Sequence, residues 1–103
     1  MLCLLLSLII SRIEANTNNY SISGRISDER TGSPLPGASI LIKGTYLWAV
    51  SDQKGEFTIQ GVQEGKYQLE ISFLGYVPAT VPVNVNNSIK GLKIQLKENT
   101  LAL

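Results

Sequence analysis

The amino-acid sequence predicts an all-β fold, a seven-stranded antiparallel β-sandwich. From residue 20 onward, apolar and polar side chains alternate with a period of two, and no helical stripe of useful length occurs. Turn signals rich in glycine, proline, asparagine and aspartate separate the alternating runs about every 8 to 12 residues, a spacing typical of sandwiches. A chain of 103 residues has room for one such domain and little more.

Each predicted strand is defined by apolar residues that share one parity. A turn-rich connection over residues 28–37 separates the first strand from the second. The third strand is a short segment over residues 48–51, and a tight turn at residues 52–55 leads to the fourth. The inward sets of the other six strands are, in chain order, Tyr20, Ile22 and Ile26; Ala38, Ile40 and Ile42; Phe57 and Ile59; Tyr67, Leu69, Ile71 and Phe73; Val77, Ala79, Val81, Val83 and Val85; and Leu92, Ile94 and Leu96.

The alternation predicts the register of the strands, and two prolines predict one sheet edge. A slip of one residue would carry Glu70 or Lys93 into the core, so the register is well specified. Pro78 and Pro82 share the outward parity of the run over residues 77–85, and proline lacks the N–H that a strand ladder needs. We therefore expect this strand to lie at an edge of its sheet, or the positions of the missing N–H groups to face solvent.

The first residues indicate an export signal. Residues 2–10 are apolar except for one serine, which suits a secretory signal and is too short for a bilayer span of ~20 helical residues. With Ala15 as a small residue at the cleavage point, we expect a signal peptide over residues 1–15 and a polar leader over residues 16–19. The alternative is a buried N-terminal helix or strand. Cys3 comes too early in the run for a lipid-modified cysteine.

The composition argues against several classes of function. Nine basic against eight acidic residues give a net charge of only +1, without the large positive excess that nucleic-acid binding needs. The chain has no histidine and a single cysteine, so it lacks the residues for Ser-His-Asp or Cys-His catalysis, for the usual zinc sites and for a disulfide. We expect a non-enzyme without cofactor, metal or catalytic residues. Most carboxylates are predicted in turns or on solvent faces: Asp28, Glu29, Asp52, Glu56, Glu64, Glu70 and Glu98.

Two pairs of residues have a functional as well as a structural interpretation. Asp52 and Glu56 supply carboxylates of the kind that bind calcium, but a calcium loop needs more of them, and an Asp that stabilises the turn is the favoured interpretation. Tyr46 and Trp48 could form a platform on which sugars stack. The favoured interpretation is structural, with the aromatic side chain packed on the sandwich or its edge.

Five segments, in their order and spacing, resemble the carboxypeptidase regulatory-like domain family. They are residues 24–28 (GRISD), 34–40 (PLPGASI), 43–45 (KGT), 51–59 (SDQKGEFTI) and 73–76 (FLGY). The resemblance spans residues 20–97. Within the family, the chain most resembles the version found at the N-terminus of SusC-type TonB-dependent outer-membrane receptors of Bacteroidetes. One departure is Trp48, where such domains usually carry glycine.

The resemblance implies a transthyretin-like sandwich, with an immunoglobulin-like Greek key, over residues 20–97 and the start of a linker over residues 98–103. It implies a non-catalytic periplasmic accessory domain of an exported, outer-membrane-associated TonB-dependent transporter, of which this chain would be a fragment. The partners would be periplasmic proteins or the receptor's plug and barrel, through an edge that the sequence does not assign. The alternative is a free-standing secreted module for adhesion or carbohydrate binding.

Overall fold

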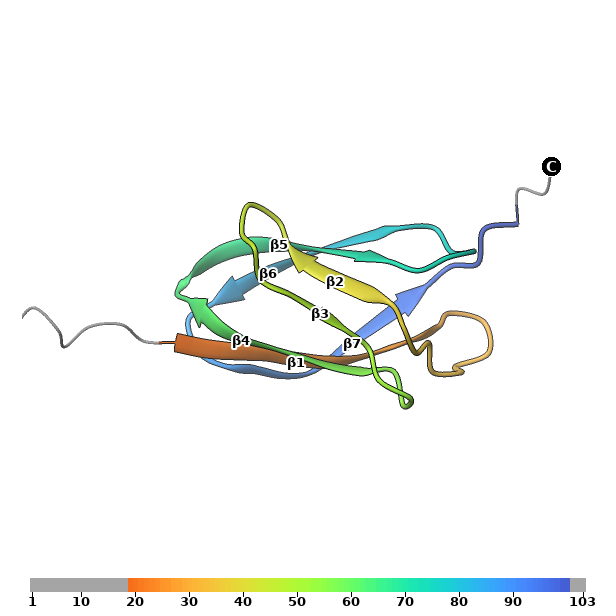
Figure 1. Cartoon of the computed structure of the whole chain (residues 1–103), viewed down its shortest axis with the longest axis horizontal. Coiled ribbons are helices and arrows are strands. Elements are labelled where there is room, and N and C mark those ends of the chain that lie inside the picture. The colour runs from red at the N-terminus through yellow and green to blue at the C-terminus, as the bar shows by residue number, and fades with distance from the viewer. Residues whose placement is uncertain (1–18, 101–103) are drawn as a thin grey trace, which may run out of the picture.

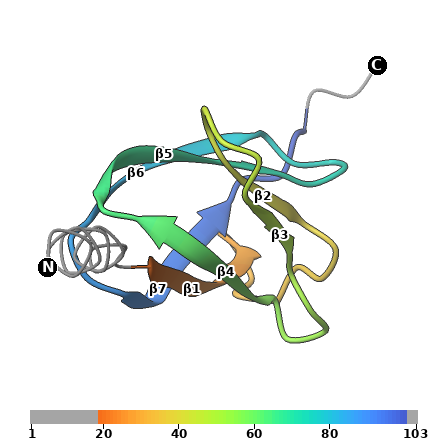
Figure 2. The same cartoon turned by 60° about the vertical axis from the view of Figure 1, so that its left-hand side comes forward.

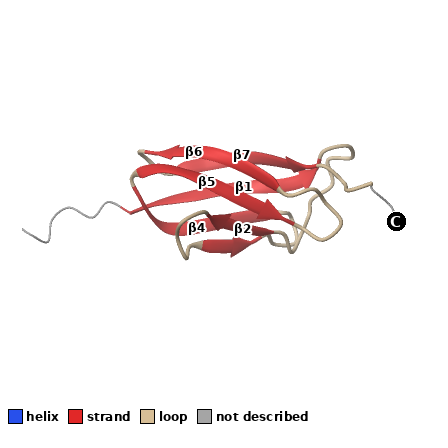
Figure 3. Ribbon diagram, turned by 90° about the horizontal axis from the view of Figure 1, so that it is seen from above, coloured by secondary structure: helices blue, strands red, loops and turns tan. Residues whose placement is uncertain are grey.

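The computed structural model describes residues 19–100, which form strands and loops (Figure 3). The predicted signal peptide, Cys3 and residues 101–103 of the predicted linker lie outside the described residues. Between residues 19 and 100 there is no helix long and apolar enough to cross a membrane. The seven predicted strands are confirmed as β1 (Asn19–Asp28), β2 (Ser39–Ile42), β3 (Trp48–Val50), β4 (Glu56–Gln63), β5 (Gly65–Ser72), β6 (Ala79–Val85) and β7 (Ile89–Leu96).

The strands form two sheets that face each other (Figure 1). One sheet has the order β4-β1-β7 and the other the order β3-β2-β5-β6, which confirms the predicted sandwich. β6, with Pro82 in its middle, lies at an edge as its prolines predicted. Glu70 and Lys93 are exposed, so the predicted register is confirmed as well.

One strand pair departs from the antiparallel pattern. β1 and β7 run parallel, with Arg25 opposite Lys93 and Asp28 opposite Leu96. Side chains alternate with a period of two in parallel and antiparallel strands alike, so alternation carries no information about direction. The chain reaches β7 from β6, which lies in the opposite sheet, so no hairpin forces β7 to run antiparallel to its neighbour.

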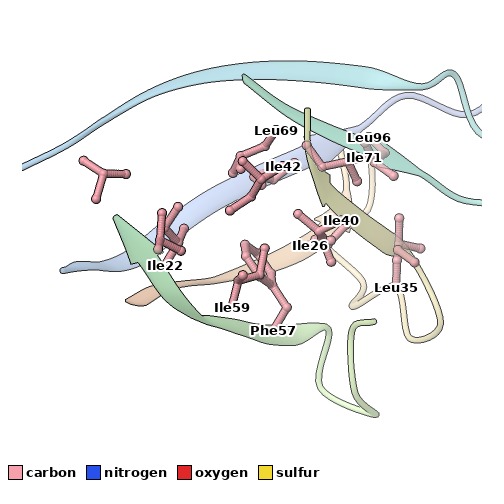
Figure 4. Packing of buried hydrophobic residues seen from close by; sticks show 14 residues of the cluster. Ile22, Ile26, Leu35, Ile40, Ile42, Phe57, Ile59, Leu69, Ile71 and Leu96 are labelled. Carbon is pink, nitrogen blue, oxygen red and sulfur yellow. The ribbon is translucent and has the colours of Figure 1, made fainter. Parts of the chain in front are cut away.

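The core lies between the two sheets and is built from the inward parity of six strands and the loop before β2 (Figure 4). All of its members except Ala38 are branched or aromatic side chains, and the β-branched and aromatic types among them pack well on a pleated surface. Burying them supplies the main driving force for folding. The fully or nearly fully buried apolar residues are Ile22, Ile26, Leu35, Ala38, Ile40, Ile42, Phe57, Ile59, Val62, Leu69, Ile71, Val85, Ile94 and Leu96.

A buried serine joins the two ends of the β2–β3 hairpin to the preceding loop. The Ser51 hydroxyl donates to the Leu35 carbonyl at 2.6 Å and accepts the Ala38 N–H at 2.9 Å. The Ser51 N–H donates in turn to the Ala38 carbonyl. The hydroxyl therefore satisfies two backbone groups that would otherwise be buried without partners.

Candidate functional site

The Asp52 carboxylate organises the turn between β3 and β4. One of its oxygens accepts the N–H groups of Lys54 and Glu56, each at 2.9 Å. The Gly55 N–H donates to the Asp52 carbonyl, and Gly55 has a φ of 76°, which only glycine adopts without strain. This geometry supports the turn-stabilising interpretation of Asp52. Within residues 19–100, no three histidine, cysteine, aspartate or glutamate side chains gather as they would around a metal ion.

Asp28 differs from the other acidic side chains predicted in turns or on solvent faces. It is 6% exposed at the end of β1, whereas the other six are exposed. One carboxylate oxygen accepts the N–H groups of Arg30 and Thr31 at 2.8 and 3.0 Å. The other accepts the Tyr76 hydroxyl at 2.6 Å, across 48 residues of sequence. The carboxylate thus joins the end of one sheet to the loop that connects two strands of the other.

The hydrogen bonds of this pair shift both acidities. The Tyr76 hydroxyl, followed by the N–H groups of Thr31 and Arg30, stabilises the charged carboxylate and lowers the pKa of Asp28 to about 2. The same hydrogen bond raises the pKa of Tyr76 above its ordinary value, because the phenol would lose its donated proton next to a negative charge. Asp28 is therefore a charged structural acceptor, the wrong state for an acid that donates protons at neutral pH.

A second set of hydrogen bonds next to this pair holds the residues that follow β7 against the loop between β5 and β6. After β7 the Lys97 carbonyl accepts the Val77 N–H at 2.8 Å, and the Asn99 N–H donates to the Gly75 carbonyl at 2.9 Å. Residues 97–99 therefore lie as an antiparallel bridge on the loop between β5 and β6. The Tyr76 ring packs at 5.6 Å from the Phe73 ring in the same loop. We call residues 28–31, 73–77 and 97–99 the exit tie.

The β2–β3 hairpin holds the two aromatic residues singled out in the sequence. Tyr46, in its loop, is 99% exposed, and Trp48, on β3, is 63% exposed. Trp48 lies opposite Leu41 in the β2–β3 register and on the same outward parity as Val50. Trp48 therefore lies on the outer surface of the edge strand rather than in the core. We call Leu41, Trp48 and Val50 the edge patch; all three are exposed apolar side chains.

Comparison with known proteins identifies the family. The family model of the CarboxypepD_reg-like domain matches residues 22–103. The chain belongs to this family. This CarboxypepD_reg-like domain is 30% identical, over 98% of its length, to TonB-dependent receptor P3 of Formosa agariphila, and 29% identical, over 97% of its length, to TonB-dependent receptor SusC of Bacteroides thetaiotaomicron. The chain spans about a tenth of the length of these receptors.

Solved structures share the sandwich. A chain of a cohesin–X-dockerin complex from Acetivibrio cellulolyticus matches 82% of the CarboxypepD_reg-like domain with a TM-score of 0.69 and 27% identity, over 61% of its own length. The backbone protein of the group B streptococcus pilus 2b matches 79% of the domain with a TM-score of 0.63 at 18% identity, over 42% of its own length. At that identity the pilus protein shows a common fold alone.

Sequence reasoning found the edge aromatics and missed the exit tie. The segment FLGY carried the family resemblance, but nothing in it or near Asp28 shows that Tyr76 and Asp28 meet. The pairing depends on the parallel course of β7, which brings residues 97–99 to the loop at residues 73–77. Alternation predicts neither the direction of the strands nor which strands are neighbours.

Proposed function

We propose that this domain is the periplasmic, non-catalytic N-terminal part of an outer-membrane TonB-dependent receptor. Its role is to space and hold the segment that follows it, and to bind other proteins. The observation that carries the proposal is that nearly the whole chain aligns with SusC-type receptors while spanning about a tenth of their length. The proposal is also supported by the exit tie, which fixes the direction in which residues 97–99 leave the sandwich.

The polar groups of the domain support a role without chemistry. The charged Asp28 carboxylate is occupied by three donors, and Asp52 by two backbone N–H groups. A nucleophile or general base needs a lone pair that reaches a substrate, with a partner that tunes it. These two carboxylates hold turns and loops in place instead.

Deleting residues 20–97 from the receptor gene that continues this reading frame tests the proposal. We expect the receptor to reach the outer membrane at its normal level, and uptake of its substrate to fall severalfold. Uptake that is unchanged at equal receptor levels, or a reading frame that does not continue into a plug and barrel, would contradict the proposal. A fusion of residues 1–100 to a phosphatase that is active only after export tests the location; it should be active, and lose activity when residues 2–10 are removed.

A second candidate is a carbohydrate-binding module, which the exposure of Tyr46 and Trp48 favours. The faces of aromatic rings stack on the apolar faces of sugars, and exposed rings on one hairpin are suited to this. Titration of soluble glycans against the fluorescence of Trp48, the only tryptophan, tests it. A saturable shift supports carbohydrate binding, and an unchanged spectrum excludes it for the glycans used.

A further inference from the structure

We infer that β3 is the docking edge of this domain, and that its ligand is an extended, uncharged polypeptide segment of another protein that pairs with Trp48 and Val50 as an additional strand. This inference rests on the proposed interaction role and names the surface and the partner class.

The hydrogen bonds of the hairpin determine which residues of β3 face outward. The Ile42 N–H donates to the Leu47 carbonyl, and the Ser51 N–H donates to the Ala38 carbonyl. In an antiparallel ladder the residues of such bonded pairs turn both backbone groups toward the partner, and the residues between them turn both away. Trp48 and Val50 therefore present their N–H and C=O groups to the side away from β2. In the strand order of its sheet, no described strand follows β3 on that side, where β4 of the other sheet passes nearby (Figure 2).

The other edge strands carry features that hinder pairing with a further strand. β6 has Pro82 in its middle. β4 and β7 each contain one extra residue relative to β1, and each places a glycine with positive φ there, Gly61 at 77° and Gly91 at 69°. Bulges and prolines are the usual means by which sheet edges resist another strand.

β3 has none of these features. Its residues and their neighbours over residues 45–51 (TYLWAVS) include no proline, glycine or charged residue. Lysines, the charged residues that most often protect an edge, lie on either side of this stretch at residues 43 and 54. An edge strand without a bulge, a proline or a charge is matched by an extended backbone without charge.

The edge patch gives the added strand apolar surface to cover. Trp48 is 63% exposed and Val50 48% exposed, and Leu41 lies beside Trp48 in the register. A strand paired with β3 places every second side chain on the same outer surface, next to Trp48 and Val50. Backbone pairing provides the affinity, and the apolar patch favours small or branched apolar side chains at alternate positions of the ligand.

The size of the edge favours a peptide over a second copy of this chain. A strand of three residues spans about 10 Å, and a contact of that length between two folded domains falls far short of the ~800 Å² per partner that stable complexes bury. A flexible extended segment needs only the edge and the patch, and binds weakly and reversibly. This is the class of contact in which a peptide adds a strand to an exposed sheet edge.

The test uses the full chain and a synthetic nonapeptide of alternating threonine and valine with blocked ends. We expect a saturable change in Trp48 fluorescence and amide NMR shifts confined to β2 and β3. The same peptide with every backbone N–H methylated keeps its side chains but cannot donate to the edge, and we expect at least about tenfold weaker binding. Equal binding of the methylated peptide, shifts centred on β6 or β7, or no saturation would overturn the inference.

Two substitutions at one position separate backbone pairing from side-chain contact. Val50→Pro removes an N–H that faces away from β2, and we expect it to abolish peptide binding with the far-ultraviolet spectrum unchanged. Val50→Thr is the matched control, keeps the N–H and the branched side chain, and should bind within about twofold of the wild type. Should Val50→Pro fail to fold, the methylated peptide still decides the question.

Other results would assign the β3 edge to a different ligand, or would overturn the docking edge without affecting the proposed function. A mass in solution that rises with protein concentration and falls with Val50→Pro would assign the edge to a second copy and overturn the inference. A fluorescence change with soluble glycan but not with the peptide would do the same in favour of a carbohydrate. Loss of transport on deletion of residues 20–97, together with no peptide binding, would overturn the docking edge and leave the proposed function standing.

Discussion

The exit tie and the β3 edge use their polar backbone groups in opposite ways. At the exit tie, hydrogen bonds connect the two sheets, and a buried carboxylate accepts three donors. At the β3 edge, Trp48 and Val50 turn their backbone groups outward beside exposed apolar side chains. The first region is satisfied within the domain, and the second has bonding capacity for another molecule. The hydrogen bonds that tie the two sheets together and the edge that we propose for binding therefore lie in separate parts of this sandwich.

Asp28→Ala should have the largest effect on stability. It leaves the N–H groups of Arg30 and Thr31 and the hydroxyl of Tyr76 without their acceptor, and each lost hydrogen bond lowers the free energy of unfolding. We expect a fall of roughly 15 °C in the thermal midpoint, followed by circular dichroism. Asp52→Ala removes the acceptor of two N–H groups in an exposed turn and should cost less. An equal loss in both variants would contradict the special position of the exit tie.

Gly55→Ala should be the next most disruptive change. Gly55 has a φ of 76°, and a Cβ at this position would collide with the Ile26 carbonyl of β1. We expect a loss of about 2 kcal/mol in the free energy of unfolding, measured with urea. The control is Gly44→Ala in the β2–β3 loop, where φ is 84° but a Cβ would meet nothing within 4 Å. This control should lose about 1 kcal/mol, and a smaller loss in Gly55→Ala than in the control would refute the prediction.

The ionisation of Asp28 and Tyr76 should limit stability at both ends of the pH scale. The pKa of Asp28 is about 2 in the folded state against 3.8 ordinarily, so its contribution is present above pH 3.8 and is lost as the pH falls from 3.8 toward 2. The pKa of Tyr76 is raised above 10, so its contribution is present below pH 10 and is lost as the pH rises through the higher folded value.

Urea midpoints between pH 2 and 11 give the measurement for this pair. Asp28→Asn should flatten the acid limb of the profile, and Tyr76→Phe should flatten the alkaline limb. An acid limb of unchanged steepness in Asp28→Asn would assign the acid sensitivity to other carboxylates. An unchanged alkaline limb in Tyr76→Phe would assign the alkaline sensitivity to other groups than Tyr76.

The contrast between the two regions also separates what sequence predicts from what it does not. Alternation is a local signal, and it correctly placed the seven strands and the exposed Glu70 and Lys93, while the prolines predicted the edge position of β6. It was wrong at Val77, which was expected to point inward and is 43% exposed in the loop before β6. The tie between Asp28 and Tyr76 joins residues 48 apart and depends on which strands are neighbours and on their direction. The favoured interpretation of Trp48 was an aromatic packed on the sandwich or its edge, but the outward direction of its backbone follows only from the hydrogen bonds of β2 and β3.

Trp48→Thr should have the smallest effect on folding. The side chain is 63% exposed, and threonine is well suited to a strand, so the free energy of unfolding should change by less than about 0.5 kcal/mol. Peptide binding, followed by NMR because the fluorophore is gone, should nevertheless weaken about three- to tenfold, since the ring covers part of the added strand. Leu74→Thr is the control, because Leu74 is 95% exposed in the loop of the exit tie and should alter neither property. A large loss of stability in Trp48→Thr would show that the edge patch serves the fold, and the separation of the two regions would then fail.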